Sequence, residues 1–270
     1  MPAINPTIEL LRRELLRFGP YGAFRDRIEL TDYFLQAPAR DADWDGLTDP
    51  LTVGESEIIM VANPNWALTG DGPADPADQV LDADGGFALT TDGTDNDQAI
   101  CFPRGAINSI VSTAWASLTL EPQHEARFQA IIELPAITAL TIQFGLGLLA
   151  NLELGGASQI DADYAKIQFS TEGAVSTTKF TAMDGIAGTD VETVLETTDV
   201  VAVDTTYNLE VRYSSTGVAR FYIDGVKKHT TSVHTAAAAL HPVFGIQALG
   251  GAVKVVKVRQ LRVSRVWQDS

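Results

Sequence analysis

The chain has 270 residues, 45% of them hydrophobic and 20% charged, which suffices for one large domain or two small ones and excludes wholesale disorder. A net charge of −16, with no stripe of basic and aromatic residues, argues against direct nucleic-acid binding. The single cysteine, Cys101, excludes an intrachain disulfide framework, and no apolar run approaches the about 18 residues of a membrane span.

The first 22 residues are predicted to form a helical arm. Asn5-Pro6 suits a helix start, because Asn is a favoured N-cap and Pro fits the first helical position. The apolar residues that follow recur at helical spacing and form one stripe, which consists of Ile4, Ile8, Leu11, Leu15 and Phe18. An isolated helix of this length is marginal in water. The stripe is therefore expected to pack either on its own β domain or on a neighbouring subunit. No apolar signal-peptide stretch occurs there, so we expect a protein made in the cytoplasm.

The remaining residues, 23–270, are predicted to form one β-sandwich domain with an irregular acidic insertion at 37–86. Between Asp32 and Asp97, fifteen acidic residues stand against one basic residue, Arg40, which gives this segment a net charge of −14. Long irregular segments are uncommon inside compact domains. The insertion is therefore expected to be an elaborated loop, an interaction arm, or a segment organised by ions.

One stretch of the insertion has the spacing of a calcium loop. Residues 41–49 match the pattern Asp-x-Asp-x-Asp-Gly-x-x-Asp and resemble the loops of dockerins and EF-hands. The carboxylates placed to converge on Ca²⁺ are Asp41, Asp43, Asp45 and Asp49. The twelfth position is Thr52, where such loops have a bidentate Glu. The alternatives are a structural Ca²⁺ ion and a solvated acidic loop.

Short β-rich runs bounded by turn residues fill the rest of the chain. Strands are expected at 27–36, 87–91, 98–102, 115–120, 125–134, 139–146, 164–169, 179–183, 208–213, 218–223, 226–231, 243–248 and 253–267. With almost no helical pattern between them, they predict an antiparallel two-sheet sandwich. The apolar residues of the last run change parity, which predicts a β-bulge near Arg259-Gln260.

The clearest pattern is a three-stranded meander at residues 207–231. Tyr207, Leu209, Val211 and Tyr213 alternate with polar residues, as in a strand with one buried face. Asp224-Gly225 is a favoured type I′ pair between the second and third strands. Residues 207–213 and 221–225 resemble the paired strands of concanavalin A-like, laminin-G-like jelly rolls. The resemblance covers about 87–267 and implies a jelly-roll fold, which hosts lectins, glycosidases, adhesion modules and viral proteins.

A second likeness is narrower. Residues 85–93, 95–100 and 112–115 look like a segment that recurs in tailed-bacteriophage virion proteins with jelly-roll domains. This likeness implies a capsid-decorating protein on the outer head surface, bound to the major capsid protein or other virion proteins. A homo-oligomer is expected, and the N-terminal stripe would contact either the capsid or neighbouring copies of the chain.

No catalytic constellation stands out. Glycosidases need two facing carboxylates, about 5–5.5 Å apart in retaining enzymes. The Glu-x-Asp-x-x-Glu run of jelly-roll glucanases is missing, and Glu210 is expected to be an isolated, solvated charge on an outer face. Cys101 lies in an apolar strand and is expected to be an inert core residue. The four histidines lack zinc-ligand spacing, so we predict neither an enzyme nor a required cofactor.

Three functions follow, in order of preference. The first is a non-enzymatic virion structural protein located on the capsid surface. The second is a carbohydrate-binding adhesin, whose exposed aromatic residues would stack on sugars; the candidates are Trp66, Tyr164 and Tyr222. The third is a glycosidase or depolymerase.

Overall fold

The computed structural model describes residues 27–32, 39–40, 66–69, 81–82, 84–103, 120–147, 163–173, 175–186, 188–195, 200–235 and 240–266. The predicted N-terminal stripe and the calcium-type loop lie outside these residues and stay predictions. The residues concerned are Ile4, Ile8, Leu11, Leu15, Phe18, Asp41, Asp43, Asp45 and Asp49. Among the described residues, no helix has the length and apolarity that a membrane crossing needs.

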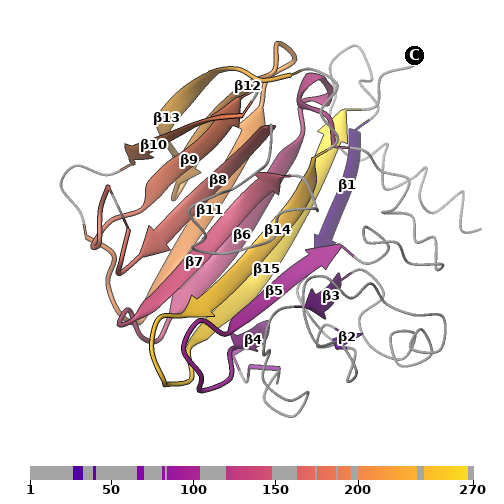
Figure 1. Ribbon diagram of the computed structural model, residues 1–270. Helices are drawn as coiled ribbons and strands as arrows, with labels where there is room; N and C mark the ends of the chain where they lie inside the picture. Colours follow the sequence, from indigo (N-terminus) through magenta and orange to yellow (C-terminus); the bar gives the residue numbers. More distant parts are fainter. Residues whose placement is uncertain are drawn as a thin grey trace, which may run out of the picture.

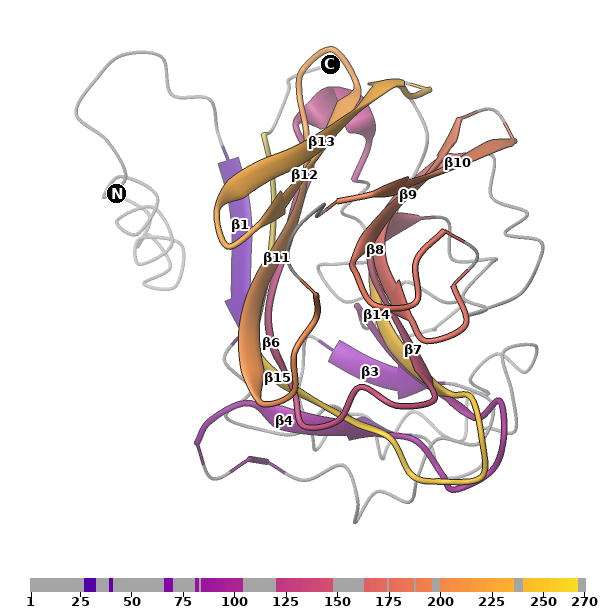
Figure 2. The same cartoon turned by 90° about the vertical axis from the view of Figure 1, so that its left-hand side faces the viewer.

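The described strands form two stacked sheets around one core (Figures 1 and 2). The seven-stranded sheet runs β1 (Arg27–Asp32), β15 (Val255–Val266), β6 (Arg127–Leu134), β11 (Thr205–Tyr213), β12 (Val218–Ile223) and β13 (Val226–Val233), with β4 (Phe87–Thr90) also paired to β15. The eight-stranded sheet runs β10 (Thr189–Val194), β9 (Thr181–Ile186), β8 (Asp163–Ser170), β7 (Leu140–Gly147), β14 (His241–Ala248), β5 (Gln98–Pro103), β3 (Trp66–Thr69) and β2 (Ala39–Arg40). The short η1 helix (Pro122–His124) precedes β6. The predicted all-β, two-sheet sandwich is confirmed.

Alternation of side chains along each strand creates the core. In β6, Phe128, Ala130, Ile132 and Leu134 point inward and are buried, while the residues between them are half-buried on the outer face. Phe128 packs on Phe144 of the opposite sheet, with ring centroids 4.4 Å apart. In Figure 2, β11 and β6 bow outward, away from the eight-stranded sheet.

The predicted meander and the predicted bulge are both confirmed. Strands β11, β12 and β13 pair antiparallel in sequence order, and Asp224 and Gly225 have φ angles of 51° and 78°, as a type I′ turn requires. The pairing of β15 with β6 shifts register between Val258 and Gln260, which is the site expected from the parity change.

Three strands depart from the expected pattern. β10 was not predicted, because its sequence TDVETV lies at the sheet edge and lacks an apolar alternation. β2 and β3 lie inside the segment expected to be irregular, and they form the one parallel pair among the described strands. Of the expected strand at 115–120, only Leu120 is described, and it bridges to Leu240.

Candidate functional site

The structure separates the three aromatic residues predicted to stack on sugars. Trp66 is fully buried, since β3 turns it inward onto Phe128 with ring centroids 6.1 Å apart. Tyr164 is only 1% exposed. The premise that these two rings are exposed is therefore wrong. Tyr222 is half-buried on the outer face of the seven-stranded sheet, and it remains accessible.

Tyr164 belongs to the outer face of the eight-stranded sheet, which is closed. Its ring lies across Gly185 of β9, where any Cβ would overlap it, and its hydroxyl bonds to Asp190, while burial raises the pKa of that hydroxyl. Lys166 lies 5.1 Å from the ring centroid and is 2% exposed. Gln143 donates to Gln168 across β7 and β8 at 2.7 Å, and both side chains are buried. The described side chains at the centre of this face are therefore buried.

A second buried polar group lies between the sheets. The Tyr213 hydroxyl is 3.3 Å from His234 Nδ1, which lies 4.0 Å from an Asp163 carboxylate oxygen. The same oxygen accepts the Thr235 backbone N–H at 3.0 Å. Burial lowers the pKa of His234 to about 4, although Asp163 opposes that shift, and burial raises the pKa of Asp184 nearby. These groups are enclosed, so they join the two layers rather than meet a ligand.

The accessible polar surface is the outer face of the seven-stranded sheet. Three arginines stand directly opposite one another on adjacent strands: Arg127 on β6 pairs with Arg212 on β11, which pairs with Arg220 on β12. Neighbouring strands are about 4.7–4.9 Å apart, so the three side chains start from one straight row. We call this row the arginine ladder. Like charges placed directly opposite each other destabilise a sheet, so their presence requires an explanation.

Glu210 compensates part of this charge. Its carboxylate forms ion pairs with both Arg127 and Arg212, and Arg212 Nη2 donates a second bond to it at 2.7 Å. The Glu210 side chain is only 4% exposed, whereas that of Arg212 is 41% exposed. The expectation that Glu210 is an isolated, solvated charge is therefore wrong, because the two flanking arginines cover it. The hydrogen bond to Glu210 raises the pKa of Arg212, while burial lowers that of Arg127.

Neutral polar groups surround the ladder. Arg127 donates to the Gln129 side chain at 3.1 Å, and Gln129 donates to the Asn208 side chain at 2.8 Å. The Arg212 guanidinium lies 4.5 Å from the ring centroid of Tyr222, within cation–π range. One face of Tyr222 is thus occupied by Arg212. The Tyr222 ring thereby positions the guanidinium, and only its other face is left to stack on a sugar.

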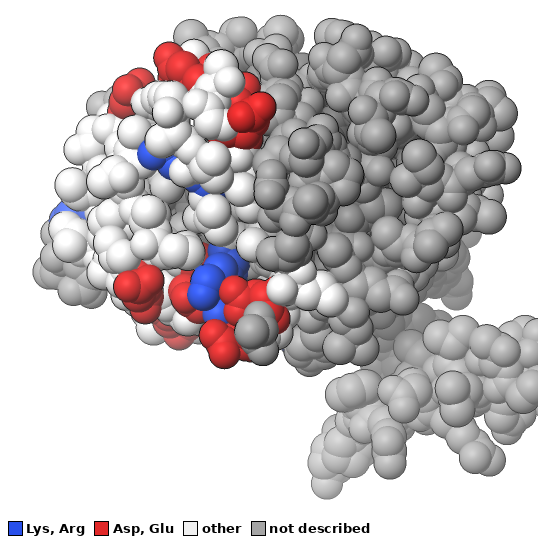
Figure 3. Space-filling model, turned by 90° about the horizontal axis from the view of Figure 1, so that it is seen from below, with Lys and Arg blue, Asp and Glu red and all other residues white. Residues whose placement is uncertain are grey.

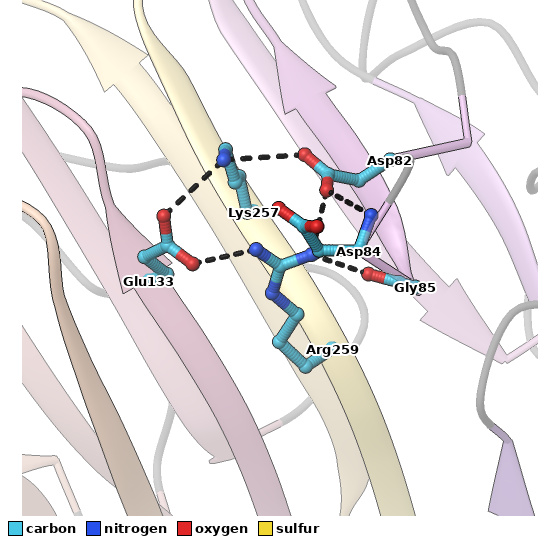
Figure 4. A network of polar contacts seen from close by, with 6 residues as sticks. All are labelled: Asp82, Asp84, Gly85, Glu133, Lys257 and Arg259. Carbon is cyan, nitrogen blue, oxygen red and sulfur yellow. Dashed lines mark hydrogen bonds and ion pairs between the residues drawn. The ribbon is translucent and has the colours of Figure 1, made fainter.

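The other end of the same face carries a balanced ion-pair network (Figure 4). Lys257 contacts Asp82 at 3.3 Å and Glu133 at 3.2 Å, and Arg259 contacts the same two carboxylates at 2.8 and 2.6 Å. Arg259 also donates to the Gly85 carbonyl at 2.6 Å, which ties the 82–86 turn to β15. From below, the most prominent basic group is bordered by acidic side chains (Figure 3). The two cations, Lys257 and Arg259, are paired with two carboxylates, so the network has no net charge.

The described residues contain no group of three or more His, Cys, Asp or Glu side chains placed to hold a metal ion. Cys101 is buried in the core, as predicted. In the acidic turn before β5, the Thr94 backbone N–H donates to an Asp97 carboxylate at 2.9 Å, a contact that Asp side chains commonly make in turns.

Comparison with solved structures identifies proteins that share this fold. No family model and no curated protein matches the chain. A protein of unknown function from Shewanella oneidensis is 12% identical, with a TM-score of 0.52 over 100% of this chain and 99% of that one. LamA from Zobellia galactanivorans, in complex with laminaritriose and laminaritetraose, is 9% identical, with a TM-score of 0.56 over 90% and 100%. A β-1,3-glucanase from Mycobacterium marinum is 12% identical, with a TM-score of 0.51 over 92% and 100%. Identities this low establish a shared jelly-roll fold and no more.

Proposed function

We propose that this chain is a carbohydrate-binding domain that does not cleave its ligand. The observation that carries the proposal is the accessible face around Arg212 and Tyr222, where guanidinium, amide and aromatic groups are presented together on three rigid strands. Such groups supply the donors, acceptors and apolar surface that sugar hydroxyls and rings need. Support at the level of architecture comes from jelly-roll neighbours that hold glucan fragments.

Binding is favoured over hydrolysis by the positions of the described carboxylates. In the eight-stranded sheet, Asp163 of β8 and Asp184 of β9 are buried between the sheets. The remaining described carboxylates on its strands are Asp190 and Glu192, and both lie on the edge strand β10. The centre of that face holds the amide pair Gln143–Gln168 together with Lys166 and Tyr164. Hydrolysis requires an acid and a base or nucleophile that flank one glycosidic bond. A paired amide cannot fill either role.

A glycan array probed with the full-length chain, with and without Ca²⁺, tests the proposal. We expect retention of at least one glycan class, lost on Arg212→Gln but kept in Lys257→Gln, which removes one cation from the balanced network on the same face. No retention in either condition rejects the proposed function. Release of reducing ends from a bound glycan rejects its non-catalytic part, and Asp190→Asn with Glu192→Gln would then test those two carboxylates.

The role of a capsid decoration protein on a virion surface stays a prediction. It depends on the segment likeness and on the arm, and the whole of the arm lies outside the described ranges. The same holds for its expected partners, the major capsid protein and further copies of this chain. Mass spectrometry of purified particles tests it, and particles without copies of the chain would exclude it. Both roles are compatible, because an adhesin can be part of a particle.

A further inference from the structure

The arginine ladder carries more positive charge than its contacts neutralise. Arg127 and Arg212 share the single carboxylate of Glu210. The Arg220 side chain forms no hydrogen bond or ion pair with any described residue, although the Cα of Arg220 lies opposite that of Arg212. Three guanidinium groups against one carboxylate leave a net charge of +2 within the ladder. This local excess of positive charge is opposite in sign to the net charge of −16 of the whole chain.

The geometry suits anionic groups that approach from solvent. The Arg212 side chain is 41% exposed, and Arg220 is half-buried beside it on the same face. A guanidinium is a planar fork that binds carboxylates and other oxyanions through two parallel hydrogen bonds. The Tyr222 ring and the Glu210 carboxylate hold Arg212 in place, so little side-chain freedom remains to be lost on binding. A carboxylate or sulfate between Arg212 and Arg220 would relieve their repulsion.

We propose that the glycan bound at this face is anionic, a polysaccharide bearing carboxylate or sulfate groups, and that Arg212 and Arg220 bind those groups. This inference rests on the proposed carbohydrate-binding function and names its ligand class. The Gln129–Asn208 amide pair beside the ladder serves sugar hydroxyls, which an acidic peptide lacks. Duplex DNA carries one charge per about 1.7 Å of axis. The ladder presents arginines at about 4.7–4.9 Å, which matches a sparser polyanion.

The test is a titration of the full-length chain with alginate, a sulfated galactan and the neutral glucan laminarin, at low and high salt. We expect the two anionic polymers to bind, and their affinity to fall as salt rises. Arg220→Gln should weaken that binding about tenfold, since a charge-assisted contact is lost. Lys257→Gln, with the same loss of one charge on the same face, should leave binding nearly unchanged. Thermal melts of both variants verify that each is folded.

The other outcomes distinguish failure of this inference from failure of the proposed carbohydrate-binding function. Binding of laminarin but of neither anionic polymer, or anionic binding that Arg220→Gln does not change, overturns the inference and leaves carbohydrate binding standing. Failure of every polymer and of the glycan array overturns both. Equal affinity for duplex DNA, or Arg220-dependent binding of a peptide with the sequence of residues 37–86, overturns the inference in favour of a general polyanion site or a second copy of this chain.

Discussion

The arginine ladder and the ion-pair network lie at opposite ends of β6, on the same face of the same sheet. In the network, Lys257 and Arg259 each reach both Asp82 and Glu133, so every charge has partners within the molecule. In the ladder, one buried carboxylate serves two arginines, and a third arginine stands beside them. The network fastens a turn to the sheet, whereas the ladder keeps charge available for a ligand. The two sites contain the same kinds of residue, and they differ in the number of carboxylates available to each basic side chain.

The largest effect is expected from Glu210→Gln, which removes the carboxylate that holds the ladder together. Half-buried Arg127 and Arg212 would then face each other without compensation. We expect the free energy of unfolding to fall by about 2–4 kcal/mol, as for other ion pairs broken away from water. Urea unfolding measures it. The matched change Glu133→Gln, in the more exposed network, should cost about 1 kcal/mol or less. Equal losses at both sites would contradict the distinction drawn between them.

In the network, Arg259→Gln should have the largest effect. It removes two ion pairs and the hydrogen bond to the Gly85 carbonyl, so the 82–86 turn loses its attachment to β15. A loss of about 1–2 kcal/mol in unfolding free energy is expected. Hydrogen exchange should speed up at the amides of Asp84 and Gly85 but not in the meander. Uniform acceleration across both sheets would show that Arg259 supports the whole sandwich instead.

Acid should weaken the network by titrating Asp82. Hydrogen bonds from Arg259 and from the Asp84 backbone lower the pKa of Asp82 to about 2, below its ordinary value near 3.8. A carboxyl whose pKa is lower in the folded state stabilises fully above its unfolded pKa and loses that contribution as pH falls toward 2. The contribution is small, about 1 kcal/mol or less, because the site is near solvent. Comparing urea unfolding of Asp82→Asn and the parent between pH 5 and pH 2 checks this, and a pH-independent difference would refute it.

The smallest expected effect has the opposite sign. Arg220→Gln removes a like charge that lies opposite Arg212, so at low salt the protein should become more stable by about 0.5 kcal/mol. At about 1 M salt the gain should disappear, since the Debye length shrinks to about 3 Å. Urea titrations at the two salt concentrations measure it. A loss of stability at low salt would mean that Arg220 makes a favourable contact within the protein.

Stabilisation by Arg220→Gln together with weaker anion binding would show that the ladder trades stability for function. The same pair of measurements on Lys257→Gln gives the reference, because that change should lower stability slightly and leave binding unchanged. The ladder and the network would then differ in both readouts.

The sequence by itself determined the layers of this protein. Alternation along 207–213, the Asp224-Gly225 pair and the parity change near Arg259 each predicted a local feature that the structure confirms. These features are local, since period-two burial and turn dihedrals depend on neighbours in the chain. Strand β10 was missed because it lies at the edge of its sheet, and its sequence lacks the alternation of apolar and polar residues.

Only the tertiary structure decided which polar residues meet. Gln129 and Asn208 are 79 positions apart in the chain, yet their side chains are bonded, and the same pairing of β6 with β11 places Arg127 against Arg212. A shift of one residue in that register would turn these side chains into the core. The register is set by the burial of apolar residues on the inner face, so the charges on the outer face follow from it. For the same reason Glu210 looked solitary in the sequence and is enclosed in the fold.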